Sequence, residues 1–283
     1  MKKEFFIADS HTDFLTELKD NNLRQDYIKS LSNTPLKLLS CAVFTTDDNL
    51  NATDVARLKN EIMASNSNSQ LLLSVEDIGF AKTKQELGRV IDLKPISCTL
   101  TWNYDNQFSG GTYGKLALTK LGVEAVKTLE ANNILVDTAH LNKKAFWHVA
   151  KITTKPIFNS HSNIYSIYRH KRNLTDKQLK AIVDTNGYLG ITLFNLFIGN
   201  KKATSKDVAM QFDYLIKNFG YKNFGFGTDL YGVSPENLPL DIAGYSDLYK
   251  VAEHLKNMGH SDEVIEHIFY KNFYNFLKRC AII

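Results

Sequence analysis

Short apolar runs alternate with longer amphipathic segments along nearly the whole chain. Each run has the length of a buried β-strand, and the runs recur at fairly even intervals. They cover residues 5–8, 36–44, 70–75, 96–101, 133–139, 156–160, 188–194 and 223–228. Strand-length runs separated by amphipathic segments are typical of repeated β–α units and a parallel sheet.

The segments between the apolar runs carry helical signals. Residues 53–64 and 119–129 repeat apolar positions at helical spacing. Thr175 is followed three residues later by Gln178, a capping-box pattern that predicts the start of a helix. Residues 261–279 place their apolar positions on one stripe, which predicts a helix packed against the rest of the fold.

The number of β–α units predicts the architecture. Eight units in roughly 250 residues fit a (β/α)8 TIM barrel, which we expect to be a single domain over residues 1–283. An open, doubly wound sheet is the competing architecture. It is less favoured because residues able to bind a metal follow the first, third, fifth, sixth and eighth runs. An open sheet would place those residues too far apart to share one site.

Six side chains with ligand chemistry stand at or just after predicted strand ends. They are His11, Asp13, Glu76, His140, His161 and Asp229. Neutral imidazoles and carboxylates are suitable ligands for zinc and similar divalent cations. One histidine at a strand end is more often a structural residue, but the recurrence favours a metal site at the carboxyl ends of the strands. We expect surface or packing roles for the other five histidines, including His170.

Composition and charge exclude several other functions. The chain has 34 basic and 30 acidic residues, a net charge of +4, and 43% hydrophobic residues, which describes a water-soluble globular protein. The basic cluster at 169–172 has no interleaved aromatic residues, so we expect no nucleic-acid partner. No run is long enough to span a membrane, and we expect no membrane partner. The first apolar run is too short for a signal peptide, so we expect it to be retained.

The cysteines indicate a reducing environment. Cys41, Cys98 and Cys280 are odd in number and widely spaced. We therefore expect buried thiols, no structural disulfide and a cytoplasmic location.

Four groups of residues are similar, in the same order, to the motifs of one enzyme family. They read Asp-Ser-His-Thr-Asp at 9–13, Val-Asp-Thr-Ala-His-Leu-Asn at 136–142, Ser-His-Ser-Asn at 160–163 with Lys-Arg-Asn-Leu-Thr-Asp at 171–176, and Gly-Phe-Gly-Thr-Asp-Leu-Tyr-Gly at 225–232. They resemble Asp-Gly-His-Asn-Asp, Ile-Asp-Leu-Ser-His-Val-Ser, Ser-His-Ser-Asn with Pro-Arg-Asn-Leu-Thr-Asp, and Gly-x-Gly-Ser-Asp-Phe-Asp-Gly of the membrane dipeptidase (renal dipeptidase) family of zinc peptidases. The resemblance implies a barrel of the metal-dependent hydrolase type.

The resemblance also implies a cofactor of two zinc ions. By position, His11 and Asp13 would hold one ion, His140 and His161 would hold the other, and Glu76 would bridge the two. Two such ions would share a hydroxide that attacks the polarised carbonyl of the scissile bond.

Two further residues take roles from the resemblance. Asp229 matches the family's acid/base, which passes a proton from the attacking water to the leaving amine. Arg172 matches the arginine that binds the terminal carboxylate of the substrate. The implied partner is a dipeptide with a free C-terminal carboxylate, and relatives suggest a homodimer.

The substrate-binding residues depart from the family pattern. Trp102 stands where mammalian members have a histidine that faces the reacting carbonyl, so Asn103, Tyr104 or the metals would take over that task. Two alternatives to a dipeptidase stay open. One is another binuclear amidohydrolase, acting on an N-acyl amino acid or a lactam. The other is a catalytically silent barrel that binds a small peptide or an amino acid.

Overall fold

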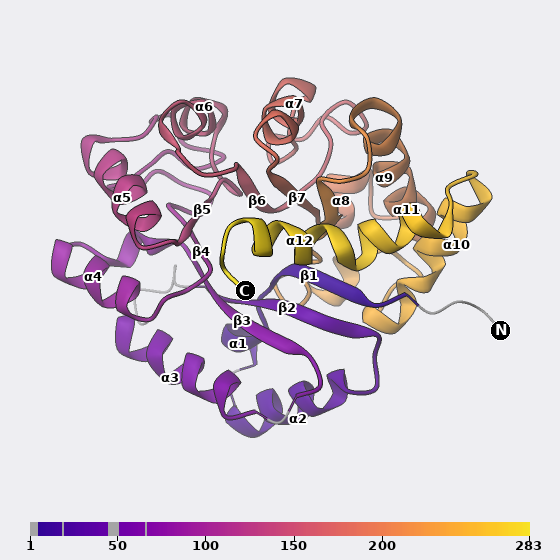
Figure 1. Cartoon of the computed structure of the whole chain (residues 1–283), viewed down its shortest axis with the longest axis horizontal. Coiled ribbons are helices and arrows are strands. Elements are labelled where there is room, and N and C mark those ends of the chain that lie inside the picture. Colours follow the sequence, from indigo (N-terminus) through magenta and orange to yellow (C-terminus); the bar gives the residue numbers. More distant parts are fainter. Residues whose placement is uncertain (1–4, 19, 45–50, 66) are drawn as a thin grey trace.

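The strands form a closed parallel barrel, which confirms the predicted (β/α)8 architecture (Figure 1). The computed structural model describes residues 5–18, 20–44, 51–65 and 67–283, so residues 1–4 of the expected domain lie outside the described part. Neighbouring strands follow sequence order around the barrel, and β1 closes it against β8 through Asp9 and Phe226. The strands are β1 (Ile7–Thr12), β2 (Leu36–Phe44), β3 (Gln70–Glu76), β4 (Ser97–Thr99), β5 (Leu135–Asp137), β6 (Phe158–Ser162), β7 (Tyr188–Ile191) and β8 (Phe224–Phe226).

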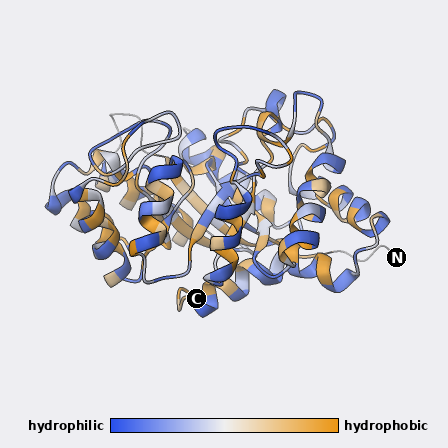
Figure 2. Ribbon diagram, turned by 90° about the horizontal axis from the view of Figure 1, so that it is seen from above, coloured by the Kyte–Doolittle hydropathy of each residue, from blue (hydrophilic) through white to orange (hydrophobic). Residues whose placement is uncertain are grey.

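Helices surround the barrel, and Figure 2 shows apolar residues concentrated on the strands and on the helix faces toward them. The α-helices are α1 (Phe14–Glu17), α2 (Asn21–Leu31), α3 (Ala52–Met63), α4 (Lys84–Asp92), α5 (Lys120–Ala131), α6 (Lys143–Ile152), α7 (Asp176–Asp184), α8 (Asn195–Ile198), α9 (Ser205–Phe219), α10 (Tyr249–Asn257), α11 (Asp262–Glu266) and α12 (Asn272–Arg279). The shorter helical turns are η1 (Ile78–Phe80), η2 (Pro235–Asn237), η3 (Tyr245–Asp247) and η4 (His267–Lys271).

The helix signals in the sequence correspond to observed helices. Residues 53–64 and 119–129 correspond to α3 and α5 within two residues at each end. Thr175 directly precedes α7, and its N–H donates to the side-chain oxygen of Gln178 at 3.1 Å. The predicted helix at 261–279 is a continuous helical run, α11–η4–α12, with a wider π-type turn at η4.

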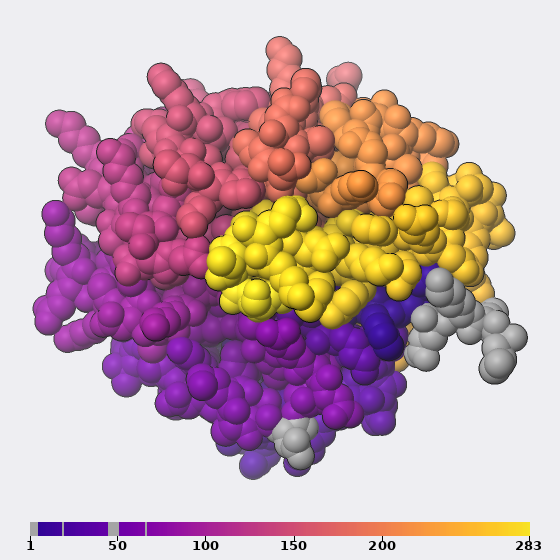
Figure 3. Space-filling view, viewed as in Figure 1, coloured from indigo at the N-terminus to yellow at the C-terminus, as the bar shows by residue number. Residues whose placement is uncertain are grey.

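The helix α12 closes the amino-terminal end of the barrel and crosses its centre in Figures 1 and 3. Phe273 and Phe276 of α12 are fully buried against Phe158 and Tyr188, the first residues of β6 and β7. The ring centroids of Phe158 and Phe276 are 5.5 Å apart, and those of Tyr188 and Phe273 are 4.9 Å apart. With this end closed by aromatic packing, the carboxyl ends of the strands are the open side of the barrel among the described residues.

The predictions about the thiols are confirmed. Cys41, Cys98 and Cys280 are buried and form no disulfide. In the described part of the chain, no helix combines the length and the apolar character that crossing a membrane would require.

Candidate metal centre and active site

The six candidate residues converge at the carboxyl-terminal mouth of the barrel. His11 and His161 lie within β1 and β6, Glu76 ends β3, and the remaining residues follow strand ends closely. Five of the six are buried, and the Asp229 side chain is 16% exposed. The sequence placed the end of the first strand at residue 8, but β1 continues to Thr12. It continues because its polar side chains find partners inside the barrel, as when Ser10 Oγ lies 2.6 Å from the carbonyl oxygen of Ser160.

Irregular strand pairing occurs beside two of the histidines. The β1–β2 register shifts between Asp9 and Thr12, and the β6–β7 register shifts between Asn159 and Ser162. Such irregularities redirect side chains locally and are frequent next to active sites. They coincide here with His11 and His161.

The two carboxylate oxygens of Glu76 face different groups of ligands. Glu76 Oε1 lies 2.8 Å from His140 Nε2 and 3.6 Å from His161 Nε2. Glu76 Oε2 lies 3.7 Å from His11 Nε2, which in turn lies 3.2 Å from Asp13 Oδ2. One carboxylate therefore stands between a His–His group and a His–Asp group, the arrangement that a bridging ligand requires.

The donor atoms in each group lie within 4.8 Å of one another, close enough to share a cation. The Nε2 atoms of His140 and His161 are 2.8 Å apart. Ligands at about 2.0–2.1 Å from one zinc ion lie roughly 3.3 Å from each other in tetrahedral geometry. Asp13 Oδ1 is buried and makes no hydrogen bond among the described residues. The residues present therefore fit a pair of divalent cations.

The protonation states suit metal binding. Burial lowers the pKa of His140 and of His161, and nearby positive charge lowers both further, so both rings are neutral near pH 7. Burial also opposes charge on His11, but the carboxylates of Asp13 and Glu76 outweigh it and raise the His11 pKa. Burial raises the pKa of Glu76. A bound cation would replace the protons that hold this cluster of buried acids and bases together.

The backbone is strained at the same mouth. Eight non-glycine residues of the described part have positive φ, and four of them follow β3, β5 or β8: Asp77, His140, Asp229 and Tyr231. Left-handed conformations cost free energy for such residues and persist where the surrounding structure enforces them, often at functional sites. His140, at φ 64°, and Asp229, at φ 62°, both bring a candidate functional side chain into the centre.

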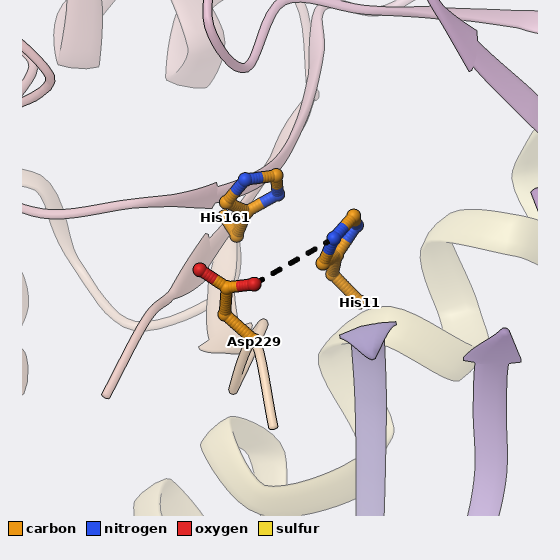
Figure 4. A group of neighbouring side chains, drawn as sticks. All are labelled: His11, His161 and Asp229. Carbon is orange, nitrogen blue, oxygen red and sulfur yellow. Dashed lines mark ion pairs between the residues drawn. The ribbon is translucent and has the colours of Figure 1, made fainter. Parts of the chain in front are cut away.

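Asp229 lies beside both groups of ligands. Its carboxylate oxygen Oδ1 is 3.8 Å from His11 Nε2, and Figure 4 shows it directed toward His11 and His161. An added Cβ at Gly232 would lie 2.2 Å from Asp13 Oδ2 and 2.4 Å from Asp229 Oδ1, so only glycine allows this approach. Burial, and then the charge of Asp13, raises the pKa of Asp229 to about 8 where no cation is beside it. Asp229 is thus placed to carry a proton, and it is also within reach of a metal.

A cavity of about 470 Å³ opens over this centre. Arg172 lines it and is only 4% exposed, because its guanidinium donates to Ser162 Oγ at 3.0 Å and to the His161 carbonyl oxygen at 3.1 Å. Trp102 and Asn103 also line it, and the Trp102 ring centroid lies 5.9 Å from that of His140. A buried arginine in a cavity of this size is suited to hold a small anionic ligand.

Tyr104 does not belong to the cavity wall. Its side chain is 66% exposed, and its ring centroid lies 6.0 Å from that of Tyr113. The sequence placed it with Trp102 and Asn103 as a substrate-binding residue, but the chain turns after Asn103. Thr101 Oγ1 donates to the carbonyl oxygen of Tyr104 at 2.5 Å and so holds that turn.

Several residues of the cavity wall were not predicted from the sequence. They are Glu17, Phe44, His170, Phe194 and Phe197, with others from the loop after β8. His170, expected to have a surface or packing role, lies over Phe197 with ring centroids 4.5 Å apart, and its Nδ1 accepts from the N–H of Arg172 at 3.2 Å. The only sequence signal for His170 is its position two residues before Arg172.

The glycine-rich segment at residues 109–114 is mostly buried. Ser109, Gly110 and Gly111 are buried, and Asn142 N–H donates to the carbonyl oxygen of Gly110 at 3.2 Å. The glycines allow close packing: an added Cβ at Gly111 would lie 2.4 Å from the Trp102 carbonyl oxygen.

Fold and site together define a (β/α)8 barrel with clustered candidate metal ligands at its open mouth. The family model described as membrane dipeptidase (peptidase family M19) matches residues 71–281. The chain therefore belongs to the membrane dipeptidase family of metallopeptidases.

The alignments with related sequences cover different shares of each relative. An uncharacterised protein from the pqqA 5' region of Klebsiella pneumoniae is 30% identical over 190 residues, which is 62% of this chain and 69% of that protein. An uncharacterised dipeptidase of Schizosaccharomyces pombe is 26% identical over 197 residues, which is 65% of this chain but 46% of that protein. The chain thus spans about half the length of the second relative.

Solved structures share the complete fold. A metallopeptidase of the same family, described as dipeptidase AC, has a TM-score of 0.88 and 18% identity, with 99% of this chain and 100% of that chain covered. A metallopeptidase from Rhodobacter sphaeroides, solved with a phosphinate mimic of the dipeptide L-Ala-D-Ala, has a TM-score of 0.84 and 18% identity, with 98% and 100% covered. At these identities the likeness establishes the fold.

Proposed function

We propose that this protein is a zinc-dependent dipeptidase that cleaves small dipeptides with a free C-terminal carboxylate. The observation that carries the proposal is the position of Glu76 between two pairs of ligand side chains, inside a cavity that also holds a buried arginine. Membership of the membrane dipeptidase family supports it. We further propose that the protein acts in the cytoplasm, because its three cysteines are buried and form no disulfide.

Five residues would hold the two zinc ions, with Glu76 as the bridging ligand. His11 and Asp13 would bind one ion, and His140 and His161 would bind the other. Bound ions of this kind lower the pKa of water and polarise a carbonyl group. Burial keeps the imidazoles of His140 and His161 neutral and so able to bind a cation.

Arg172 would orient the substrate. Its guanidinium is fixed by Ser162 and the His161 backbone, and Nη2 lies 3.1 Å from His140 Nε2, so its charge stands next to the reaction centre. A planar guanidinium binds a carboxylate through two parallel hydrogen bonds. A carboxylate held there would place the adjacent amide bond of a dipeptide over Glu76 and His140.

Asp229 would move the proton. An amine leaves poorly as an anion, so peptide cleavage requires a proton at the departing nitrogen, and a single carboxyl can carry it from the attacking water. Asp229 lies on the side of the centre nearest His11. Its mainly buried position, which favours the protonated form, suits a group that must accept a proton and then donate it.

The decisive experiment combines metal analysis with substrate tests. We expect up to two zinc equivalents in the purified protein and cleavage of dipeptides from a panel of L-L and L-D pairs. C-terminally amidated dipeptides and N-acyl amino acids are the controls. Cleavage of N-acyl amino acids without cleavage of dipeptides would favour another amidohydrolase. Metal binding without cleavage of any of these amides would favour a silent binding barrel.

A further inference from the structure

The loop between β4 and α5 holds His140 from two sides. Asn103 Oδ1 lies 3.0 Å from Nδ1 of the His140 ring, and Thr112 Oγ1 donates to the His140 carbonyl oxygen at 3.0 Å. His140 has a φ of 64°, so it needs such support to keep its conformation. The loop therefore fixes both the backbone and the ring of one candidate ligand.

The surroundings of the ring determine which nitrogen carries the proton. Arg172 Nη2 lies 3.1 Å from His140 Nε2, and a guanidinium can only donate hydrogen bonds, so this contact favours a lone pair on Nε2. The neutral ring then carries its proton on Nδ1, which donates to Asn103 Oδ1. Nε2 faces Glu76 and His161, each 2.8 Å away, where a cation would sit.

The backbone of Asn103 is itself held in place. Asp77, the residue after Glu76, accepts hydrogen bonds from the Trp102 N–H and from Asn106 Nδ2, the latter at 3.0 Å. On the other side, Tyr113 N–H donates to the Asn103 carbonyl oxygen at 2.8 Å. A carboxylate attached to the end of β3 thus anchors the loop that supports His140.

We propose that Asn103 is a positioning residue of the metal centre, which holds His140 in the Nδ1–H tautomer, and that Asp77 fixes the loop that carries Asn103. This inference rests on the metal centre of the proposed function and deepens it. It gives Asn103 a role in addition to the predicted substrate contact, because the amide oxygen faces His140. Outer partners of this kind commonly contribute about 10–100-fold to metal affinity.

Nitrogen NMR of the unaltered, zinc-loaded protein tests the tautomer directly. With ¹⁵N-labelled histidine, we expect His140 to carry a proton on Nδ1 and to bind zinc through Nε2. His267, whose Nδ1 lies 2.9 Å from Asn272 Oδ1, makes the same kind of contact far from the site and serves as an internal reference. Zinc bound through Nδ1 of His140 would overturn the proposal, whether or not any variant folds.

Zinc affinity, measured by competition with a chromophoric chelator, tests the positioning role of Asn103. We expect Asn103→Ala to weaken one of the two zinc equivalents by about 10–100-fold, and Asn103→Asp, which keeps an acceptor oxygen, to restore it within a few-fold. Asp77→Ala should weaken the same equivalent. Asn218→Ala, whose amide donates to the Tyr214 carbonyl oxygen on the exposed face of α9, is the control and should bind both ions normally.

The outcomes separate the two proposals. If the unaltered protein binds no zinc, the proposed function fails and this inference fails with it. If the unaltered protein binds two ions and Asn103→Ala binds both with the same affinity, the proposed function stands and this inference alone is wrong.

Discussion

The guanidinium of Arg172 donates a hydrogen bond to the hydroxyl of Ser162 over 3.0 Å, next to the candidate ligand His161. This contact places a permanent positive charge inside the barrel mouth, where it is 4% exposed. Lysine could supply the charge but could not keep the two-pronged geometry.

Arg172→Lys should therefore lower kcat/KM for dipeptides by roughly 30–150-fold, which corresponds to about 2–3 kcal/mol for a hydrogen bond to a charged group. Steady-state kinetics with free and amidated dipeptides provides the measurement. Arg169→Lys is the matched control, because Arg169 is exposed in the same loop. If amidated dipeptides are cleaved as well as free ones, Arg172 does not bind the substrate carboxylate.

Asp229→Asn keeps the shape of the side chain but removes its ability to carry a proton. We expect kcat to fall by roughly 10²–10⁴, the usual contribution of a positioned acid/base. Zinc content, measured by atomic spectroscopy, should stay at the level of the unaltered protein. Loss of zinc in this variant would make Asp229 a ligand, which its distance of 3.8 Å from His11 Nε2 also allows.

Removal of metal should lower the thermal stability as well as the activity. Asp13 and Glu76 are buried on either side of His11, and without cations only bound protons offset their charges. We expect a lower Tm after chelation and recovery of Tm and activity on addition of zinc. Full activity in a preparation free of metal would contradict the proposed function.

The closure of the barrel by α12 predicts a large packing contribution. Phe276→Ala should lower the free energy of unfolding by about 3–5 kcal/mol, the usual cost of removing a buried phenylalanine. Leu240→Ala, at a side chain that is 69% exposed, should change it by less than about 0.5 kcal/mol. Urea denaturation measures the free energy of unfolding of both variants. If Phe276→Ala is as stable as Leu240→Ala, α12 is only loosely attached to the barrel.

The cysteines should be unreactive in the folded protein. Cys41 and Cys98 are fully buried, and burial raises the pKa of each thiol well above its ordinary value, so little thiolate exists near neutral pH. Burial also raises the pKa of Cys280. A thiol-specific disulfide reagent should react with three groups only after unfolding, and rapid reaction of the native protein would contradict this burial.

Much of the site follows from simple sequence rules. In a parallel barrel the carboxyl ends of all strands meet, so ligand residues such as Glu76 and His161 can be brought together from strand order alone. The positions of side chains on the loops cannot be predicted from strand order, because they depend on the path of each loop. Tyr104 and Asn103 are neighbours in the sequence, yet one is exposed and the other contacts His140.

Long-range packing explains the remaining differences between prediction and structure. His170 enters the cavity wall because Phe197, from α8, supplies an aromatic surface beneath it. The glycines at 110 and 111 look like flexible positions in the sequence, but their lack of a side chain lets two loop segments pack closely. Neither effect leaves a periodic pattern in the sequence.

The aromatic closure by α12 also bears on how the protein is synthesised. Until Asn272–Arg279 has left the ribosome, the apolar floor formed by Phe158 and Tyr188 has no cover. The nascent chain would then carry an open-ended barrel that exposes aromatic rings, the kind of surface that promotes aggregation and recruits chaperones. Completion of the fold is therefore coupled to translation of a helix that contributes no residue to the metal centre.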